Sequence, residues 1–359
     1  MSYKLCKLPL DESFNTVEVL QKLLSVNDAL SDLDKEILLL PNYQLILKPL
    51  TMREAVASSE IENIRTTTLE MLEAELLNTK LLPPNQKEVI SYRNALLVGY
   101  ETLLNNGNLE LSDIINIHCN IVPDKVRLRT KRGVYVGNAL GDIVYTPPQD
   151  PKEIEDFMNN LLEFINSDYD PILKIIVTHY QFEAIHPFRD GNGRAGRILM
   201  ALMFCLEKKL KYPILFVSGY ILRNKQSYYQ LFRDIQDNGN WNNWIRYHLN
   251  GIEQQAVETM ERILEIQAIR TILLDSITLL LKPKTPNSTK QIPNFVQSLD
   301  KYFFSRAFYT QTNLSKELCI SRITAKKYLE LFKANNLLDS RKAGKELLYF
   351  IPKFVEVLG

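Results

Sequence analysis

Residues 186–197 read H-P-F-R-D-G-N-G-R-A-G-R, and this short stretch combines a histidine, an aspartate, arginines and a glycine-framed turn. The preceding residues, 171–184, carry apolar side chains at helical spacing, and residues 193–208 are again apolar with good helix formers. Pro187 is expected to end the first helix, because proline cannot continue its hydrogen-bonding pattern. The stretch therefore predicts a tight loop between two buried helices.

The predicted loop has the features of an anion site. The second helix would begin near Gly193, so that its unpaired N–H groups and the positive end of its dipole face the loop. Phosphate is the usual ligand of such a helix start, and Gly191 and Gly193 would let it approach the main chain closely. Arg194 and Arg197 share one helix face and could hold two phosphates of one chain.

Other side chains of the loop add chemistry to this anion site. Asp190 offers the hard oxygen ligand that Mg²⁺ prefers beside phosphates, and His186 can take up a proton near neutral pH. Asn192 could add a side-chain donor, and Phe188 is expected to point inward and anchor the loop. These residues indicate phosphoryl or nucleotidyl transfer without deciding between them. The P-loop motif G-x-x-x-x-G-K-[S/T] is absent from the sequence.

The stretch resembles the signature of the Fic family, H-P-F-x-[D/E]-G-N-G-R-x-x-R, at every fixed position. This resemblance implies transfer of AMP from ATP to a serine, threonine or tyrosine hydroxyl of a protein, including the chain itself. It implies that His186 is the general base, that Asp190 holds a Mg²⁺ ion between the α- and β-phosphates, and that Arg197 holds the γ-phosphate. The ATP-binding residues that it implies are Gly191, Asn192, Gly193, Arg194, Ala195, Gly196 and Arg197.

A second short motif lies upstream, in the predicted helical segment 52–65. Ser58 and Glu62 are four residues apart and share one helix face, and Asn63 is a plausible helix C-cap. By itself, this pattern is also typical of a solvent-facing helix end. It is similar to the inhibitory pattern [S/T]-x-x-x-E-[G/N] of Fic proteins, which implies that Glu62 pairs with Arg197 and competes with the γ-phosphate.

Two further segments are given roles by the same resemblance. Residues 134–136 and 143–146 predict a short β-hairpin with its turn at 137–142. This hairpin is either a surface feature without a task or the flap that aligns a protein target as an added strand. In residues 224–237, Tyr229 is a candidate contact for the adenine base, and Tyr228 and Gln236 are weaker candidates. His118, His179 and His248 are interpreted as core histidines.

The composition indicates an ordinary globular protein of several domains. The chain has 359 residues, of which 45% are hydrophobic and 24% charged, and a net charge of +1. The four cysteines show no C-x-x-C spacing, so neither a zinc site nor a disulfide framework is indicated. Neither a signal sequence nor an apolar run of about 18 residues is found, which predicts a cytoplasmic protein without a membrane partner.

The predicted fold class is mainly α, with a Fic-type helical core, a short β-hairpin flap and a C-terminal winged helix–turn–helix domain. Separate helices are expected over residues 17–29 and 32–40, and again over residues 241–249 and 251–281. The predicted domains are an N-terminal helical region carrying the inhibitory motif, the catalytic core, a helical connector with a linker at 282–293, and the winged-helix domain. Their boundaries are 1–105, 106–250, 251–293 and 294–359. The long helical pattern could also provide a homodimer contact.

The C-terminal part is basic. From residue 286 onward there are 12 lysines and arginines against 6 acidic residues, a surplus of +6. This surplus and the helix–turn–helix phrasing of residues 312–333 are typical of a DNA-binding module. Residues 323–333, however, contain few side chains that read base edges, and winged helices also bind proteins, so both partners remain open.

Three functions are compatible with these patterns. The first is an adenylyltransferase that Glu62 holds inactive. The second is a DNA-binding regulator in which the helical core senses a nucleotide, although the intact His186 and Asp190 favour an enzyme. The third is an enzyme with related chemistry, namely AMP removal or transfer of another phosphate-linked group.

Overall fold

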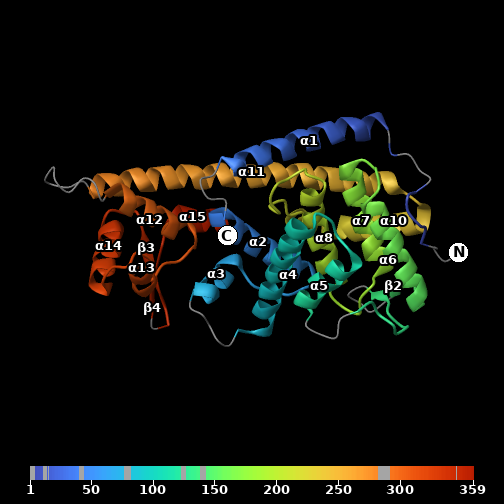
Figure 1. The fold of residues 1–359 in the computed structure, drawn as a ribbon, viewed down its shortest axis with the longest axis horizontal. Helices are drawn as coiled ribbons and strands as arrows, with labels where there is room; N and C mark the ends of the chain where they lie inside the picture. Colours follow the sequence, from blue (N-terminus) through green and yellow to red (C-terminus); the bar gives the residue numbers. More distant parts are fainter. Residues whose placement is uncertain are drawn as a thin grey trace. The chain divides into compact units, whose positions relative to one another are not determined.

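The computed structural model describes residues 5–10, 14, 16–39, 44–76, 82–122, 127–137, 143–281, 292–344 and 346–359. The described chain is mostly α-helical, with two small antiparallel sheets of two strands each (Figure 1). This confirms the predicted mainly-α class. Of the predicted linker at 282–293, residues 282–291 lie outside the described residues, whereas 292 and 293 begin helix α12 (Ile292–Phe304). Residues 138–142 of the predicted hairpin turn and Lys345 also lie outside the described residues.

The chain divides into two compact units. The first consists of Met1–Lys35, Ala57–Ile64 and Lys87–Thr259, and the second of Glu36–Val56, Arg65–Gln86 and Met260–Gly359. Some helices contribute residues to both units: α1 (Val17–Leu38), α2 (Gln44–Ile61), α4 (Pro84–Asn106) and α11 (Trp241–Leu280). All the predicted site residues, from Ser58 to Tyr229, belong to the first unit.

The first unit is built around two consecutive helices, α7 (Pro171–Ile185) and α8 (Asn192–Leu206). Almost every residue of α7 is buried, as expected for a helix with neighbours on all sides. The helix begins sharply because Asp170 accepts hydrogen bonds from the amides of Ile172 and Leu173. Packed around this pair are α5 (Leu111–Ile121) and α6 (Pro151–Ile165), while α9 (Ser218–Arg223) and α10 (Lys225–Asn238) follow in the chain.

Two predicted helix breaks are wrong. Residues 17–38 form the single helix α1, because Leu30 and Leu33 continue its buried stripe through the expected break. Residues 241–280 likewise form one 40-residue helix, α11 (Figure 1). Gly251 does not interrupt this helix. A Cβ at this position would lie 2.6 Å from the Tyr220 ring, so the glycine allows Tyr220 to pack closely against the helix. The short helix α9 (Ser218–Arg223) has no counterpart among the predicted elements.

The first hairpin is shorter than predicted. Strand β1 (Val136–Gly137) pairs antiparallel with β2 (Ile143–Tyr145), with Val136 opposite Tyr145. The hydroxyl of Tyr145 donates to the main-chain oxygen of Ala184 at 2.9 Å, which ties β2 to the end of α7. Gln149 closes the base of the hairpin, because its amide donates to the Val134 oxygen at 2.9 Å and its Oε1 accepts from the Gly133 amide at 2.8 Å.

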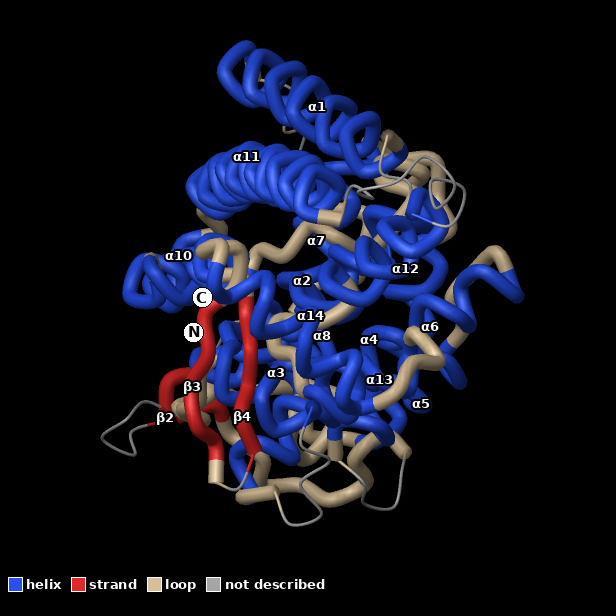
Figure 2. Tube along the Cα trace, turned by 90° about the vertical axis from the view of Figure 1, so that its left-hand side faces the viewer, coloured by secondary structure: helices blue, strands red, loops and turns tan. Residues whose placement is uncertain are grey.

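The second unit contains the C-terminal elements and α3 (Thr68–Leu76), which packs against α15 (Pro352–Leu358). Helices α12 (Ile292–Phe304), α13 (Gln311–Glu317) and α14 (Arg322–Ala334) precede an antiparallel hairpin of β3 (Asp339–Ala343) and β4 (Glu346–Phe350) (Figure 2). Tyr309 adds a further bridge to Tyr349 on β4. Buried aromatic side chains, including Phe303 and Phe332, form the core of these elements.

Among the described residues, no helix combines the length and the apolar character needed to cross a bilayer.

Candidate active site

The loop between α7 and α8 is held in an unusual main-chain conformation. His186 ends α7 with a φ of 50°, and Gly191 precedes α8 with a φ of 75°. A non-glycine residue with positive φ costs free energy and persists only where its surroundings hold it. The two ends of the loop therefore depend on contacts from other segments.

Asn192 closes the loop from inside. Its Oδ1 accepts from the Phe188 amide at 2.8 Å, and its Nδ2 donates to the Phe188 oxygen at 2.9 Å. Both ends of the side chain thus take part in closing the loop, and one of the two Nδ2 hydrogens is used for the Phe188 oxygen. Phe188 points inward as predicted and is 1% exposed.

Two residues outside the motif hold the loop in place. Arg129 donates from Nε to the His186 oxygen at 2.8 Å, and its Nη2 donates to the Pro148 oxygen. The ring of His118 stacks on Phe188 at 3.8 Å, and its Nε2 lies 2.7 Å from the Asp190 oxygen. His118 is thus buried, as predicted, but it supports the motif loop in addition to filling the core.

His186 has the electrostatic environment of a neutral base. Burial is the main cause that lowers its pKa to about 4, and the nearby charge of Arg129 acts in the same direction. The main-chain oxygen of Glu183 and the carboxylates of Glu62 and Asp190 partly offset these effects. The imidazole is therefore unprotonated at neutral pH, which is the form that accepts a proton.

The start of α8 presents main-chain amides to the loop. Helical hydrogen bonding begins with the Ala195 amide, which donates to the Gly191 oxygen at 3.0 Å, so the amides of residues 192–194 precede it. These three amides are the available donors for an anion. Ala195 and Gly196 already lie inside the helix. Gly196 leaves room for Glu183, because a Cβ at position 196 would lie 2.4 Å from Oε1 of Glu183.

Asp190 is the most accessible acidic group of the loop. Its side chain is 76% exposed, and one oxygen, Oδ1, accepts from the Gly191 amide at 2.6 Å. Among the described residues, no group of three or more His, Cys, Asp or Glu side chains forms a metal cluster. A single carboxylate suits Mg²⁺, which commonly binds one or two carboxylates together with substrate phosphates.

The two predicted phosphate ligands both pair with carboxylates in this structure. Arg194 is almost fully buried, and its Nη1 lies 2.8 Å from Oε2 of Glu88 on α4. Arg197 is 5% exposed, and its Nη2 lies 2.9 Å from Oε1 of Glu62. Glu88 was missed by the sequence reasoning, because it lies 106 residues from its partner and belongs to no motif.

Arg197 makes three hydrogen bonds with Ser58 and Glu62, at the end of α2 and just after it. Its Nε donates to Ser58 Oγ at 2.7 Å, and its Nη2 donates to the Ser58 oxygen at 3.0 Å as well as to Glu62. Burial acts to raise the pKa of Glu62, but the charge and hydrogen bond of Arg197 outweigh it and hold the pKa below its usual value. The two side chains that the family resemblance pairs are thus in direct contact.

The segment carrying Glu62 is fixed by a tight turn. Asn63 adopts a φ of 64°, as expected for a C-cap, and the amides of Glu62 and Ile64 both donate to the Ser59 oxygen at 3.0 Å. Lys225 at the start of α10 donates to the Ile61 oxygen at 2.5 Å. Gly193 completes the fit, since a Cβ there would lie 2.5 Å from Glu62 Oε1.

A second carboxylate lies near Arg197. Burial raises the pKa of Glu183 to about 7, with the charge of Arg197 opposing and that of Glu62 reinforcing the shift. Its Oε1 is buried and has no hydrogen-bond partner among the described residues. Glu183 was missed because, within the sequence, it is one polar residue on an otherwise apolar helix.

The tyrosines proposed for base contacts differ in accessibility. Tyr229 is 40% exposed and lies within the electrostatic reach of Glu62 and Arg197. Tyr228 is buried, and its hydroxyl lies 3.1 Å from Nε2 of the core histidine His179. Tyr229 is therefore the accessible aromatic ring beside the predicted phosphate ligands, whereas Tyr228 belongs to the core, as does His248.

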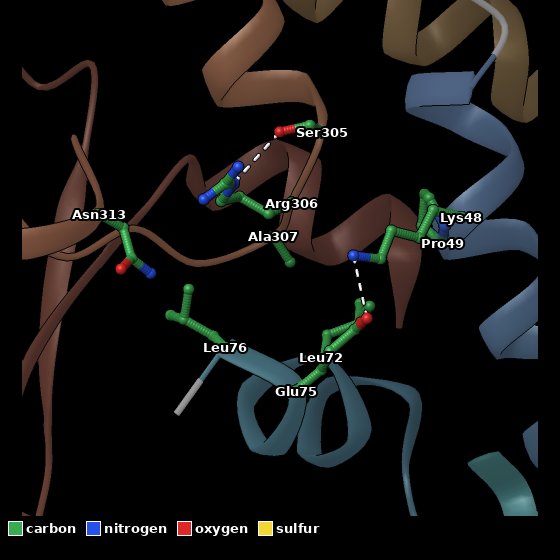
Figure 3. A pocket seen from close by; sticks show the side chains of 9 residues that line it. All are labelled: Lys48, Pro49, Leu72, Glu75, Leu76, Ser305, Arg306, Ala307 and Asn313. Carbon is green, nitrogen blue, oxygen red and sulfur yellow. Dashed lines mark hydrogen bonds and ion pairs between the residues drawn. The ribbon is translucent and has the colours of Figure 1, made fainter. Parts of the chain in front are cut away.

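A separate pocket lies in the second unit and contains none of the predicted site residues (Figure 3). It has a volume of about 210 Å³ and lies among α2, α3 and the segment that joins α12 to α13. Its charged groups already have partners: Lys48 pairs with Glu75 at 3.0 Å, and Arg306 contacts Ser305 and Glu317. The charges of Lys48 and Arg306 are therefore already neutralised by neighbouring carboxylates.

Comparison with known proteins connects this site to one family. Residues 108–204 match the profile of the Fic/DOC family, and residues 20–101 match that of the Fic/DOC family N-terminal region. A protein adenylyltransferase Fic from Nematostella vectensis is 30% identical over 169 residues, which are 42% of this chain and 39% of that protein. A probable protein adenylyltransferase from Aquifex aeolicus is 26% identical over 195 residues, 52% of this chain and 56% of that protein.

The fold extends further than the sequence similarity. A Fic family protein from Desulfovibrio desulfuricans superimposes with a TM-score of 0.59 at 18% identity, over 95% of this chain and 98% of that one. The chain thus has the fold of that protein. It spans less than two thirds of the curated relatives, with shares of 39%, 23% and 38% of the first three.

Proposed function

We propose that this chain is a protein adenylyltransferase, which transfers AMP from ATP to a serine, threonine or tyrosine hydroxyl of a protein. The observation that carries the proposal is the loop between α7 and α8. There a neutral, half-buried histidine and the free amides at the start of α8 occur beside two buried arginines. The curated relatives named protein adenylyltransferase support the same activity.

The proposed reaction assigns one proton transfer to His186. The imidazole takes the proton from the target hydroxyl as its oxygen attacks the α-phosphorus of ATP. The new oxygen–phosphorus bond forms while the bond to the β-phosphate oxygen breaks, and pyrophosphate leaves. Because the pKa of His186 is lowered to about 4, the proton passes readily to solvent afterwards.

The phosphates would be held by the main chain and by arginines. The amides of residues 192–194 would bind phosphate oxygens at the start of α8. Arg194 and Arg197 would hold the terminal phosphates by paired hydrogen bonds. Mg²⁺ would be held by Asp190 together with these phosphates, and would neutralise part of their charge.

The same contacts support a proposal of autoinhibition by Glu62. Every described hydrogen bond of the Arg197 guanidinium is with Ser58 or Glu62, so a γ-phosphate would compete with the carboxylate for this group. The two anions compete for one buried cation, and removing Glu62 should therefore release the site. Ser58 would keep the guanidinium oriented in either state.

The protein target is proposed to dock on the hairpin of β1 and β2. An exposed strand edge can pair with an extended peptide through main-chain hydrogen bonds. The hairpin is tied to the end of α7 by Tyr145 and, through Pro148, to Arg129. A peptide added there would lie beside the segment that carries His186.

The test is mass spectrometry of the full chain after incubation with ATP and Mg²⁺. We expect Glu62→Gly to gain the mass of AMP, and Glu62→Gly with His186→Ala to gain none. Glu60→Gly is a matched control, because Glu60 is exposed in the last turn of α2, two residues before Glu62, and it should behave as the unmodified sequence does. Absence of modification in Glu62→Gly with ATP and with other nucleotides would contradict the proposal and favour AMP removal or nucleotide sensing.

A further inference from the structure

Helices α13 and α14 form a helix–turn–helix with a fixed turn. Cys319 adopts a φ of 53°, and Ser315 Oγ donates to the Ile320 oxygen at 2.6 Å. Gln311 Nε2 donates to the Arg322 oxygen at 2.9 Å, and Ser321 caps α14 by accepting from the Thr324 amide at 3.1 Å. The first turns of α14 are therefore held rigidly.

One face of α14 is buried and the opposite face is cationic. The buried face consists of Ala325, Leu329 and Phe332, each at 0% exposure. The exposed residues of its first two turns include Arg322, Ile323, Lys326 and Lys327. Since the apolar face holds the helix in the core, the cations are directed to solvent.

The side chains of these cations have no acidic partner among the described residues. In the part of the chain that the structure describes, Arg322, Lys326, Lys327 and the exposed Lys342 on β3 form no ion pair. By contrast, Arg341 pairs with Glu73 and stacks on Phe308, while Lys333 donates to Ser340. Unpaired surface cations repel one another, and a polyanion would relieve this repulsion.

We propose that the exposed cations at the start of α14, Arg322, Lys326 and Lys327, together with Lys342 on β3, bind the phosphate backbone of double-stranded DNA. The segment from residue 286 onward carries a charge surplus of +6, whereas the whole chain carries +1. Such concentration of positive charge is the electrostatic footprint of nucleic-acid binding. The proposal is independent of AMP transfer, because none of these residues belongs to the loop between α7 and α8.

The geometry favours DNA over RNA. A single α-helix fits the major groove of B-form DNA, whereas the corresponding groove of double-stranded RNA is too narrow and deep. Ile323 is 71% exposed at the start of α14 and could contact a thymine methyl group. With few other base-reading side chains on this face, binding is expected to depend mainly on phosphate contacts and to tolerate many sequences.

The test is fluorescence anisotropy of a labelled mixed-sequence DNA duplex titrated with the full chain at several salt concentrations. Four phosphate contacts predict that log K falls against log salt with a slope of about −3.6. Lys326→Glu with Lys327→Glu should weaken binding by at least about tenfold and reduce the slope by about 2. Lys326→Arg with Lys327→Arg should bind as the unmodified chain does, because the charge is kept.

Two controls make the test specific. Lys301→Glu with Lys353→Glu changes the net charge equally on α12 and α15, where both lysines are exposed, and should leave affinity and slope nearly unchanged. His186→Ala should bind DNA normally, which separates this inference from the proposed catalysis. The proposal would be overturned if the anisotropy stayed unchanged at low salt. It would also be overturned if the control pair lost as much affinity for DNA as the Lys326→Glu with Lys327→Glu variant. Equal competition by double-stranded RNA would overturn the assignment to DNA.

Discussion

Arg197 and Glu62 lie 135 residues apart in the sequence, yet the arginine Nη2 and the carboxylate Oε1 are 2.9 Å apart in the folded chain. The side chain of Arg197 is 5% exposed and that of Glu62 is 37% exposed. The arginine therefore depends on Glu62 to neutralise its charge, while Glu62 retains access to water. This asymmetry makes the carboxylate the replaceable partner and the arginine the fixed one.

Loss of Glu62 should destabilise the free protein and strengthen its response to ATP. Without its partner, the buried Arg197 charge is uncompensated, and we expect Glu62→Gly to lose about 1–3 kcal/mol of unfolding free energy. ATP should restore that compensation, so the rise in Tm on adding ATP and Mg²⁺ should exceed that of the unmodified chain. Differential scanning fluorimetry measures both quantities, with Glu60→Gly as the control. Equal nucleotide-induced shifts in all three proteins would argue against competition for Arg197.

Arg129 should control the position of His186 more than the binding of nucleotide. Arg129→Lys keeps the positive charge but loses the planar set of donors that holds the oxygens of His186 and Pro148. In a Glu62→Gly background, we expect the rate of AMP transfer to fall by at least about tenfold, since small displacements of reacting groups are costly. The Kd for ATP should change by less than about threefold, as isothermal titration calorimetry would show. A parallel loss of ATP affinity would instead indicate general disruption of the loop.

The low pKa of His186 has a consequence for the pH profile of transfer. Because burial lowers this pKa to about 4, the base is unprotonated down to about pH 5. In a Glu62→Gly background, kcat/KM should therefore stay level from pH 8 to about 5.5, apart from other groups that titrate in this range, and fall only below it. Circular dichroism at each pH would establish that the protein remains folded. An acid limb centred near 6.5 would show that the histidine is more accessible to water than the structure indicates.

Glu183 should make stability fall as the pH rises through its titration. Its folded-state pKa of about 7 lies above the usual 4.5, so the unfolded chain loses this proton first. The unfolding free energy should then decrease between about pH 4.5 and 7 through this residue, by on the order of 2–3 kcal/mol. Glu183→Gln cannot ionise and should remove that decrease. In urea unfolding, the stability of the variant relative to the unmodified chain should therefore be higher at pH 8 than at pH 5. An unchanged difference between the two pH values would mean that Glu183 is already ionised at pH 5.

Local patterns predicted the helices on either side of the central loop, because the apolar spacing before and after residues 186–197 is strong and the glycines mark the turn. The C-cap at Asn63 and the inward position of Phe188 also follow from residue type. The breaks expected within α1 and α11 were wrong, since packing against neighbouring side chains carried both helices through weak breaking signals.

The sequence by itself determined the loop and its chemistry: a histidine and an aspartate in the loop, and two arginines in the first turns of the following helix. The upstream motif also indicated that Glu62 could pair with Arg197. Only the tertiary structure decided which groups complete that site. The pairing of Arg194 with Glu88, the anchoring of the His186 carbonyl by Arg129 and the burial of Glu183 all join or enclose side chains through the packing of separate helices. Such contacts produce no periodic pattern in the sequence. Hydrogen bonds and charge interactions require short distances, and residues that are far apart in the chain come this close only when it folds.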